Sequence, residues 1–163
     1  MKMKYSKILL LTLTLASFGL SSNAQSFFKK HPGINPYKYE VIKEATFSKA
    51  AVTSAHPLAS MVGSAIMKDG GNAFDGAIAT QFTLAVVFPG AGNIGGGGFM
   101  LARKSNGDLL GIDYREAAPS KANRDMYLDE KGNPIVKMSL DGASASGIPG
   151  SVAGMIATHA YAK

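Results

Sequence analysis

The chain changes character within residues 89–99, which read Pro-Gly-Ala-Gly-Asn-Ile-Gly-Gly-Gly-Gly-Phe and hold six glycines in the nine positions after the proline. Before this segment apolar residues recur with a helical period, and after it the pattern is that of short strands. The chain has 163 residues, 46% of them apolar and 17% charged. This length and composition are those of one ordinary globular domain rather than of a disordered segment.

The glycine-rich segment first suggests nucleotide binding, because Gly90, Gly92 and Gly95 satisfy the G-x-G-x-x-G pattern of dinucleotide-binding proteins. That pattern needs a strand before it and a helix that begins within it, so that the helix N-terminus meets the pyrophosphate. Here a predicted helix precedes the segment and a predicted hairpin follows it. Four consecutive glycines would also weaken a helix start by about 1 kcal/mol each relative to alanine. We therefore expect no nucleotide cofactor, and nothing else in the sequence predicts another cofactor.

Two helices are predicted before the glycine-rich segment, and a short buried strand is predicted before them at residues 50–54. Pro57 suits the first position of a helix, and Gly70-Gly71 suits its end. Asn72 is a good cap for the second helix, with Asp75 near its positive end. Helical spacing predicts that the second helix buries an apolar stripe: Phe74, Ala77, Ile78, Phe82 and Ala85.

A β-hairpin and a last helix are predicted after the glycine-rich segment. Residues 99–105 and 108–114 are the expected strands, joined by Asn106-Gly107 in a two-residue type I′ turn. Residues 116–148 are rich in turn formers, with a short helix predicted near 123–128 and a turn at 132–134. The last helix begins after Pro149, and we expect it to bury three apolar residues: Val152, Met155 and Ile156.

Residues 1–24 have the form of a secretory signal peptide. Three lysines precede the apolar run at 8–20, and small residues at Ser22 and Ala24 suit a signal peptidase. The run is shorter than the roughly 20 residues that a transmembrane helix needs. Without the three lysines the net charge falls from +6 to +3, so the basic excess does not indicate nucleic-acid binding. We expect export to the periplasm or the medium, with no membrane anchor after cleavage.

Few side chains suggest chemistry by themselves. The chain has no cysteine and three histidines, His31, His56 and His159. Their spacing suggests no metal site, and we interpret all three as structural. Arg115 follows the second predicted strand and could hold a carboxylate by paired charge-assisted hydrogen bonds. Residue type alone favours the alternative, a surface ion pair with Asp113 or Glu116.

Five segments, in order along the chain, resemble the γ-glutamyltransferase family and cover about residues 48–163. Two of them, Ala-Val-Thr-Ser-Ala-His-Pro-Leu-Ala at 51–59 and Gly-Gly-Asn-Ala-Phe-Asp at 70–75, lie in the region of the two helices. The glycine-rich segment contributes Ile-Gly-Gly-Gly-Gly-Phe-Met at 94–100. Asp-Tyr-Arg-Glu-Ala-Ala-Pro at 113–119 and Gly-Ile-Pro-Gly-Ser-Val-Ala-Gly at 147–154 complete the set.

The resemblance implies an α+β fold, part of the four-layer αββα sandwich of the N-terminal-nucleophile hydrolases. Members are zymogens that cleave themselves before an internal threonine. This threonine then attacks the γ-glutamyl amide of glutathione or a related compound and passes the glutamyl group to water or an amino acid or peptide acceptor. Arg115 matches the family arginine that holds the α-carboxylate of the γ-glutamyl group, which favours the carboxylate clamp over the surface pair. The glycine-rich segment can serve simply to let backbones pack closely.

No Thr-Thr-His processing motif occurs in the sequence, so we expect the catalytic threonine outside this chain. We expect residues 1–24 to be the signal peptide, 25–48 an irregular leader, and 49–163 a truncated N-terminal portion of the large subunit. Its partners would be the rest of that subunit and the small subunit of the same precursor, and by itself the fragment would be inactive. The alternative is an exported module that binds a carboxylate without catalysis.

Overall fold

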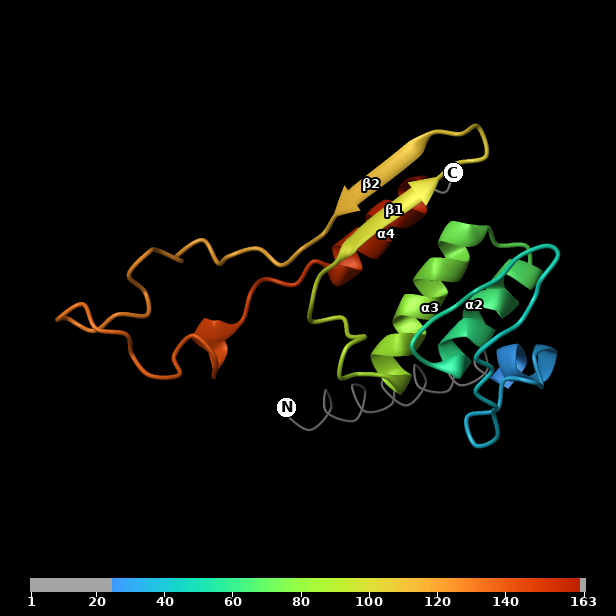
Figure 1. The fold of residues 1–163 in the computed structure, drawn as a ribbon, viewed down its shortest axis with the longest axis horizontal. Coiled ribbons are helices and arrows are strands. Elements are labelled where there is room, and N and C mark those ends of the chain that lie inside the picture. Colours follow the sequence, from blue (N-terminus) through green and yellow to red (C-terminus); the bar gives the residue numbers. More distant parts are fainter. Residues whose placement is uncertain (1–24, 162–163) are drawn as a thin grey trace, which may run out of the picture. The chain divides into compact units, whose positions relative to one another are not determined.

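The computed structural model describes residues 25–161, so the predicted signal peptide lies outside the described residues. The chain divides between Ala45 and Thr46 into two compact units. In the first, residues 25–30 are helical. This corrects the expectation of irregular structure from residue 25, because the breakers Pro32 and Gly33 act only beyond that helix. All the elements labelled in Figure 1 belong to the second unit.

Helices α2 (Pro57–Lys68) and α3 (Ala73–Val87) confirm the two predicted helices and their ends (Figure 1). Pro57 is the first residue of α2, and Gly70 follows the helix with a φ of +104° that favours glycine. At the start of α3 the Asn72 side chain accepts hydrogen bonds from the backbone N–H groups of Phe74 and Asp75, at 2.8 and 3.1 Å. The Asp75 carboxylate accepts from the Asn72 N–H at 2.9 Å, which completes a capping box.

The contact between α2 and α3 is made by small residues. A methyl group on Gly63 of α2 would collide with Thr80 Oγ1 and lie 2.8 Å from the Gly76 carbonyl oxygen, both on α3. Gly76 and Thr80 are the buried residues of α3, whereas Phe82 of the predicted stripe is exposed. The predicted stripe is therefore wrong at Phe82 and at Ala77, which is also exposed, because close backbone approach selects the small-residue face of α3 as the contact with α2.

The predicted hairpin is present, with a different turn. Strands β1 (Phe99–Arg103) and β2 (Leu109–Asp113) pair antiparallel, with Phe99 opposite Asp113 and Arg103 opposite Leu109. The Lys104 N–H donates to the Asp108 carbonyl at 2.8 Å, and the Gly107 N–H donates to the Lys104 carbonyl at 2.9 Å. Three residues thus form the loop, which corrects the two-residue type I′ turn. Of the three loop residues, only Gly107 takes a positive φ, +95°, as in a turn followed by a glycine bulge.

Helix α4 (Ser151–Tyr161) lies beside the hairpin (Figure 1). Its buried residues recur at helical spacing: Ser151, Gly154, Met155 and Thr158. Thr158 Oγ1 lies 3.4 Å from Met100 Sδ of β1. Met155 is buried as predicted, but Val152 and Ile156 are exposed. The sequence periodicity marked the apolar side of α4, whereas the contact with the hairpin is made by its smaller residues.

The chain between the hairpin and α4 leaves and returns through one antiparallel bridge, Ala117 with Ile148. Within this excursion, residues 124–127 form turns where a short helix was predicted. The Met126 and Leu128 N–H groups each bond a carbonyl three residues earlier and the pattern does not continue. The regular helical element there is instead a single 3₁₀ turn, Ala143–Ala145. The turn predicted at 132–134 lies slightly earlier, over residues 129–133: it contains Gly132, whose φ is +82°, whereas Pro134 pairs with Leu128 in a bridge.

The predicted strand at 50–54 is not formed. Partial burial alternates at Val52 and Ser54, as it would in a strand, but β1 and β2 make up the only sheet in residues 25–161. A strand needs a hydrogen-bonded neighbour, and the described residues supply none there. The same part of the chain contains no helix long and apolar enough to cross a membrane.

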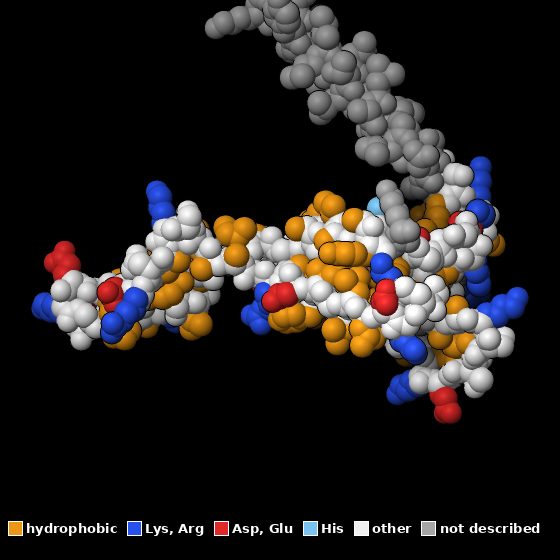
Figure 2. Space-filling model, turned by 90° about the horizontal axis from the view of Figure 1, so that it is seen from above, with side chains coloured by type: hydrophobic (Ala, Val, Ile, Leu, Met, Phe, Trp, Pro, Cys, Tyr) orange, Lys and Arg blue, Asp and Glu red, His pale blue; other side chains and the backbone are white. Residues whose placement is uncertain are grey.

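Large apolar side chains remain exposed on both the hairpin and the helices, and much of the face seen in Figure 2 is apolar. On the hairpin, Leu101 is 90% and Leu109 is 83% exposed. Because both strands alternate in burial, these two side chains share the face turned away from the partly buried Met100 and Ile112. Helices α3 and α4 expose Val86 and Ile156. The second unit thus presents large apolar side chains to solvent on its hairpin and on two of its helices.

Candidate functional site

Three of the five segments that carry the resemblance meet in space. The chain from Tyr114 to Ala117 runs directly out of β2, with the glycine-rich segment on one side. Gly98 and Tyr114 exchange two backbone hydrogen bonds of 3.3 and 3.0 Å, which extends the hairpin by one pair. On the other side, Ala117 and Ile148 exchange bonds of 3.1 and 2.8 Å. Arg115 therefore lies between two fixed backbone pairs.

The glycines of this junction are needed for close packing. A methyl group on Gly97 would lie 2.6 Å from the Tyr114 carbonyl oxygen and 2.7 Å from the Glu116 nitrogen. The Gly96 carbonyl accepts hydrogen bonds from the N–H groups of Gly150 and Ser151, at 2.9 and 3.0 Å. These contacts connect the glycine-rich segment to the start of α4. They support the interpretation that the glycines of this segment let neighbouring backbones pack closely.

The structure also bears on the nucleotide alternative through the surroundings of the glycine pattern. Helix α3 precedes the segment and β1 follows it. The helix whose N-terminus does meet the segment is α4, and the N–H groups of Ser151, its first residue, and of Gly150 just before it are already bonded to Gly96. The strand–loop–helix context of a dinucleotide-binding pattern is absent from this stretch of residues 73–103.

Arg115 is on the surface at the end of β2. Its side chain is 66% exposed, and Nε lies 3.4 Å from a carboxylate oxygen of Glu116. Its guanidinium carbon lies 5.9 Å from the centre of the Phe99 ring, within reach of a weak cation–π contact. The Arg115 N–H donates to the Asp113 carboxylate at 2.9 Å. Both residues named in the surface-pair alternative thus contact Arg115. The Glu116 carboxylate contacts the Arg115 side chain, whereas the Asp113 carboxylate accepts a hydrogen bond from the Arg115 backbone N–H.

An exposed guanidinium of this kind can bind a carboxylate ligand. Arginine presents several N–H donors in one plane, and the neighbouring carboxylate contacts it at Nε. The ion pair between Arg115 and the adjacent Glu116 lies at the surface, where such pairs contribute only about 0–1 kcal/mol to stability. A ligand carboxylate can therefore displace or share the Glu116 contact at little cost.

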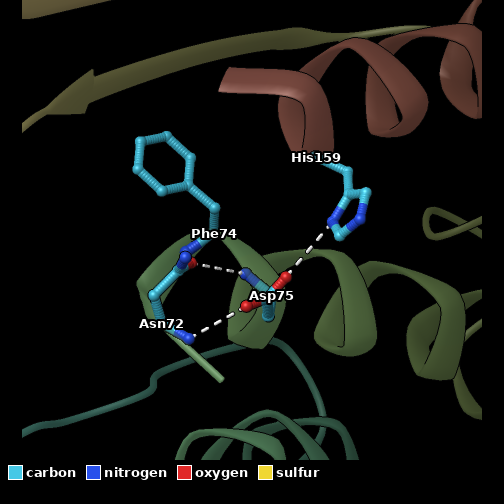
Figure 3. A network of polar contacts seen from close by, with 4 residues as sticks. All are labelled: Asn72, Phe74, Asp75 and His159. Carbon is cyan, nitrogen blue, oxygen red and sulfur yellow. Dashed lines mark hydrogen bonds and ion pairs between the residues drawn. The ribbon is translucent and has the colours of Figure 1, made fainter. Parts of the chain in front are cut away.

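Each of the three histidines contacts a neighbouring residue in the structure. His56 is the N-cap of α2, and its Nδ1 accepts a hydrogen bond from the Leu58 N–H at 3.3 Å. His31 lies against the Phe27 ring in the first unit. In Figure 3 His159 of α4 points at Asp75 of α3, and Nδ1 lies 3.3 Å from the carboxylate. Asp75 thus serves both the cap of α3 and a surface link to α4.

Thr158 and His159 are adjacent in the sequence and are residue types that can act as nucleophile and base, but they do not form such a pair. Thr158 is buried toward Met100 and its hydroxyl donates to the Gly154 carbonyl at 2.8 Å, whereas His159 faces Asp75. Within residues 25–161, no group of three histidine, aspartate and glutamate side chains is placed to hold a metal ion.

Sequence reasoning missed the part that Tyr114 plays at this junction. Its ring lies against Gly98 and Gly154, which are 56 positions apart. Gly150, the residue before α4, and Gly154 on it are four positions apart, so they lie on one side of the start of that helix. That spacing is a signal for close helix packing, but it does not say which side chain the helix would meet.

The comparisons with known proteins agree with the five segments. The family model described as gamma-glutamyltranspeptidase matches residues 59–162. The chain is 51% identical over 115 residues to the glutathione hydrolase proenzyme of Escherichia coli K12, covering 71% of this chain and 20% of that protein. A less similar relative is the acylase ACY 1 proenzyme of Pseudomonas sp. V22, 40% identical over 69% of this chain and 21% of that protein.

A solved structure has the same arrangement of helices and strands. The crystal structure of Helicobacter pylori gamma-glutamyltranspeptidase matches with a TM-score of 0.69 at 47% identity, covering 72% of this chain and 34% of that one. The mixture of helices and strands expected from the resemblance is thereby confirmed. The chain spans about a fifth of the length of the curated relatives it matches. On the extent of the family match, this chain belongs to the gamma-glutamyltranspeptidase family.

Proposed function

We propose that this chain is the N-terminal portion of the large subunit of an exported γ-glutamyltransferase, made as a self-cleaving proenzyme. In this proposal Arg115 binds the α-carboxylate of the γ-glutamyl donor, such as glutathione. The observation that carries it is the position of Arg115, exposed at the end of β2 between two backbone pairs formed by resembling segments. Several relatives are named as glutathione hydrolase proenzymes, which supports the donor and the processing.

The reaction needs a nucleophile that the rest of the precursor would supply. A threonine hydroxyl oxygen attacks the γ-amide carbonyl while its own α-amino group takes the proton. The C–N bond then breaks, the leaving amine takes the proton, and the glutamyl group remains as an ester on the threonine. Water or an acceptor amine attacks that ester and releases glutamate or a new γ-glutamyl compound. The contribution of Arg115 is to hold the donor so that its γ-carbonyl meets the threonine.

The exposed apolar surface supports the proposal that further chain packs here. In an αββα sandwich the hairpin face with Leu101 and Leu109 would lie against a second sheet. The unformed strand at 50–54 would gain a hydrogen-bonding neighbour in the same way. Burial of two leucine side chains contributes about 1.5–3 kcal/mol each, enough to favour assembly over exposure. The proposal includes export directed by a signal peptide at residues 1–24 and an αββα sandwich for the complete protein.

The test is an Arg115→Ala variant of the complete gene product, assayed by release of nitroaniline from γ-glutamyl 4-nitroanilide. Loss of a charge-assisted hydrogen bond costs about 1.5–3 kcal/mol, so the donor KM should rise at least tenfold. Arg124→Ala is the matched control, because Arg124 is also an exposed arginine beside an acidic neighbour, Asp125. Its KM should match that of the unaltered protein.

The same assay decides between the proposal and its alternatives. An unchanged donor KM for Arg115→Ala would remove Arg115 from the site. No nitroaniline release by the unaltered complete gene product, together with binding of glutamate, would favour a carboxylate-binding module. Release of a side-chain acyl group from a substrate without an α-carboxylate, with no turnover of the γ-glutamyl anilide, would favour an acylase.

A further inference from the structure

The ring of Tyr114 occupies a slot whose walls are glycines. A methyl group on Gly98 would lie 2.9 Å from Tyr114 Cε2, and one on Gly154 of α4 would overlap the same ring at Cγ. Side-chain carbons do not approach so closely in folded proteins, because the repulsion is steep. Only glycine at both positions leaves room for the ring. The slot therefore fixes the orientation of one particular side chain.

The backbone that follows the ring is held as well. The Tyr114 N–H donates to the Gly98 carbonyl at 3.0 Å, and the Gly98 N–H donates to the Tyr114 carbonyl at 3.3 Å. On the other side, a methyl group on Gly150 would collide with the Tyr114 carbonyl oxygen and lie 3.0 Å from that of Arg115. The peptide between Tyr114 and Arg115 is thus enclosed by the glycine-rich segment and by Gly150, the residue that precedes α4.

The Arg115 side chain has no comparable support of its own. It is 66% exposed, and the contacts of its guanidinium are with Glu116, about 37% exposed, and with the exposed Phe99 ring. Contacts at the surface do not hold a long side chain in one direction, because they are weak against its rotamer entropy. The direction in which Arg115 leaves the chain must then come from its backbone.

We propose that Tyr114 is a positioning residue for Arg115: its ring, seated between Gly98 and Gly154, fixes the backbone from which the guanidinium reaches the donor carboxylate. This inference rests on the proposed function of Arg115. The positioning is due to the ring of Tyr114. Its hydroxyl contributes little, because Oη donates only a long hydrogen bond of 3.4 Å to the Phe99 carbonyl.

The experiment uses the complete enzyme with γ-glutamyl 4-nitroanilide as the donor. Tyr114→Ala should raise the donor KM about tenfold, the equivalent of about 1.4 kcal/mol of binding free energy, with kcat changed much less. Tyr114→Phe keeps the ring and should restore the original KM. Gly154→Ala fills the slot by one methyl group and should raise KM in the same direction. Gly90→Ala is its control, because a methyl group there meets nothing within 4 Å.

A double-variant cycle separates positioning from general structural damage. If Tyr114 acts through Arg115, the KM of Tyr114→Ala with Arg115→Ala should equal that of Arg115→Ala alone. Additive increases in KM would overturn the inference while leaving the role of Arg115 intact. An unchanged KM in Arg115→Ala would overturn both the inference and the proposed function. Where Tyr114→Ala does not accumulate as processed enzyme, the Gly154→Ala variant decides, and an unchanged KM there overturns the inference.

Discussion

Gly63 of α2 lies directly against Thr80 of α3, so closely that a side-chain carbon on Gly63 would overlap the threonine hydroxyl oxygen. Thr80 is buried, and its hydroxyl donates to the Gly76 carbonyl at 2.8 Å. The hydroxyl is therefore satisfied within its own helix, and the space beside it is available only to a residue without a side chain. This contact sets the distance between the two helices that precede the glycine-rich segment.

Gly63→Ala should therefore destabilise the protein. The added methyl group must push the helices apart, and overpacking of this kind typically costs about 1–3 kcal/mol. Gly76→Ala is the comparison, because a methyl group there would lie 3.0 Å from the flexible Met67 side chain and 3.2 Å from the Gly63 carbonyl oxygen, without the overlap found at Gly63. Alanine favours a helix by about 1 kcal/mol over glycine at either position, so the smaller crowding at Gly76 should make Gly76→Ala the less costly change. Thermal unfolding of the complete protein measures both, and equal changes would contradict the assigned contact.

Asn72→Ala should lower the stability of α3. The Asn72 side chain bonds two N–H groups at the start of that helix, and loss of such a cap costs about 1 kcal/mol. His159→Ala should cost less, because its link to Asp75 lies at the surface, where an ion pair contributes about 0–1 kcal/mol. Urea unfolding midpoints give the two costs. A larger effect at His159 would show that the link between α3 and α4 matters more than the cap.

The ends of α2 and α3 could be predicted because their signals are local. Pro57, Gly70 and Asn72 each act through backbone geometry or a bond to a residue within three positions. The hairpin could be predicted on the same grounds. Arg115 was found by its place at the end of a strand together with the resemblance, and the structure shows it exposed there.

The contacts between distant segments could not be predicted, because they depend on what each face meets. Phe82 and Ile156 suit a buried helix face by spacing, but the faces used in the described residues are those of Thr80 and Gly154. The predicted strand at 50–54 failed for a related reason, since strand formation requires a partner. The slot around Tyr114 joins residues that no local rule connects.

Gly107→Ala should destabilise the hairpin more than Asn106→Ala. Gly107 has a φ of +95°, where a side chain costs about 1 kcal/mol or more. The Asn106 side chain accepts a hydrogen bond from the Asp108 N–H at 3.1 Å and donates one to the exposed Asp108 carboxylate at 2.7 Å, and alanine loses both without backbone strain. A two-residue type I′ turn would need a positive φ at both positions and would make the two losses more nearly equal. Hydrogen exchange of the Lys104 amide, which bonds across the loop, measures each effect.

Acid should loosen the turn that Asp129 holds. The Asp129 carboxylate accepts hydrogen bonds from the N–H groups of Asn133 and Lys131, at 2.8 and 2.9 Å, and these bonds, chiefly that of Asn133, lower its pKa. The turn therefore prefers the ionised form. Its added stability is complete above the ordinary pKa of an aspartate and is lost as the pH falls through the lowered value.

The measurement is amide exchange across residues 127–136, corrected for the intrinsic effect of pH. Protection in the unaltered protein should fall only in strong acid, below the ordinary pKa of an aspartate, which is about 3.9. Asp129→Asn has no carboxylate to titrate, so its protection should be lower throughout and show no such step. Asp125→Asn is the control, because it removes an exposed carboxylate nearby and leaves the Asp129 bonds in place. A step that persists in Asp129→Asn would assign the acid sensitivity to another group, because the variant has no carboxylate at the position that accepts these two turn hydrogen bonds.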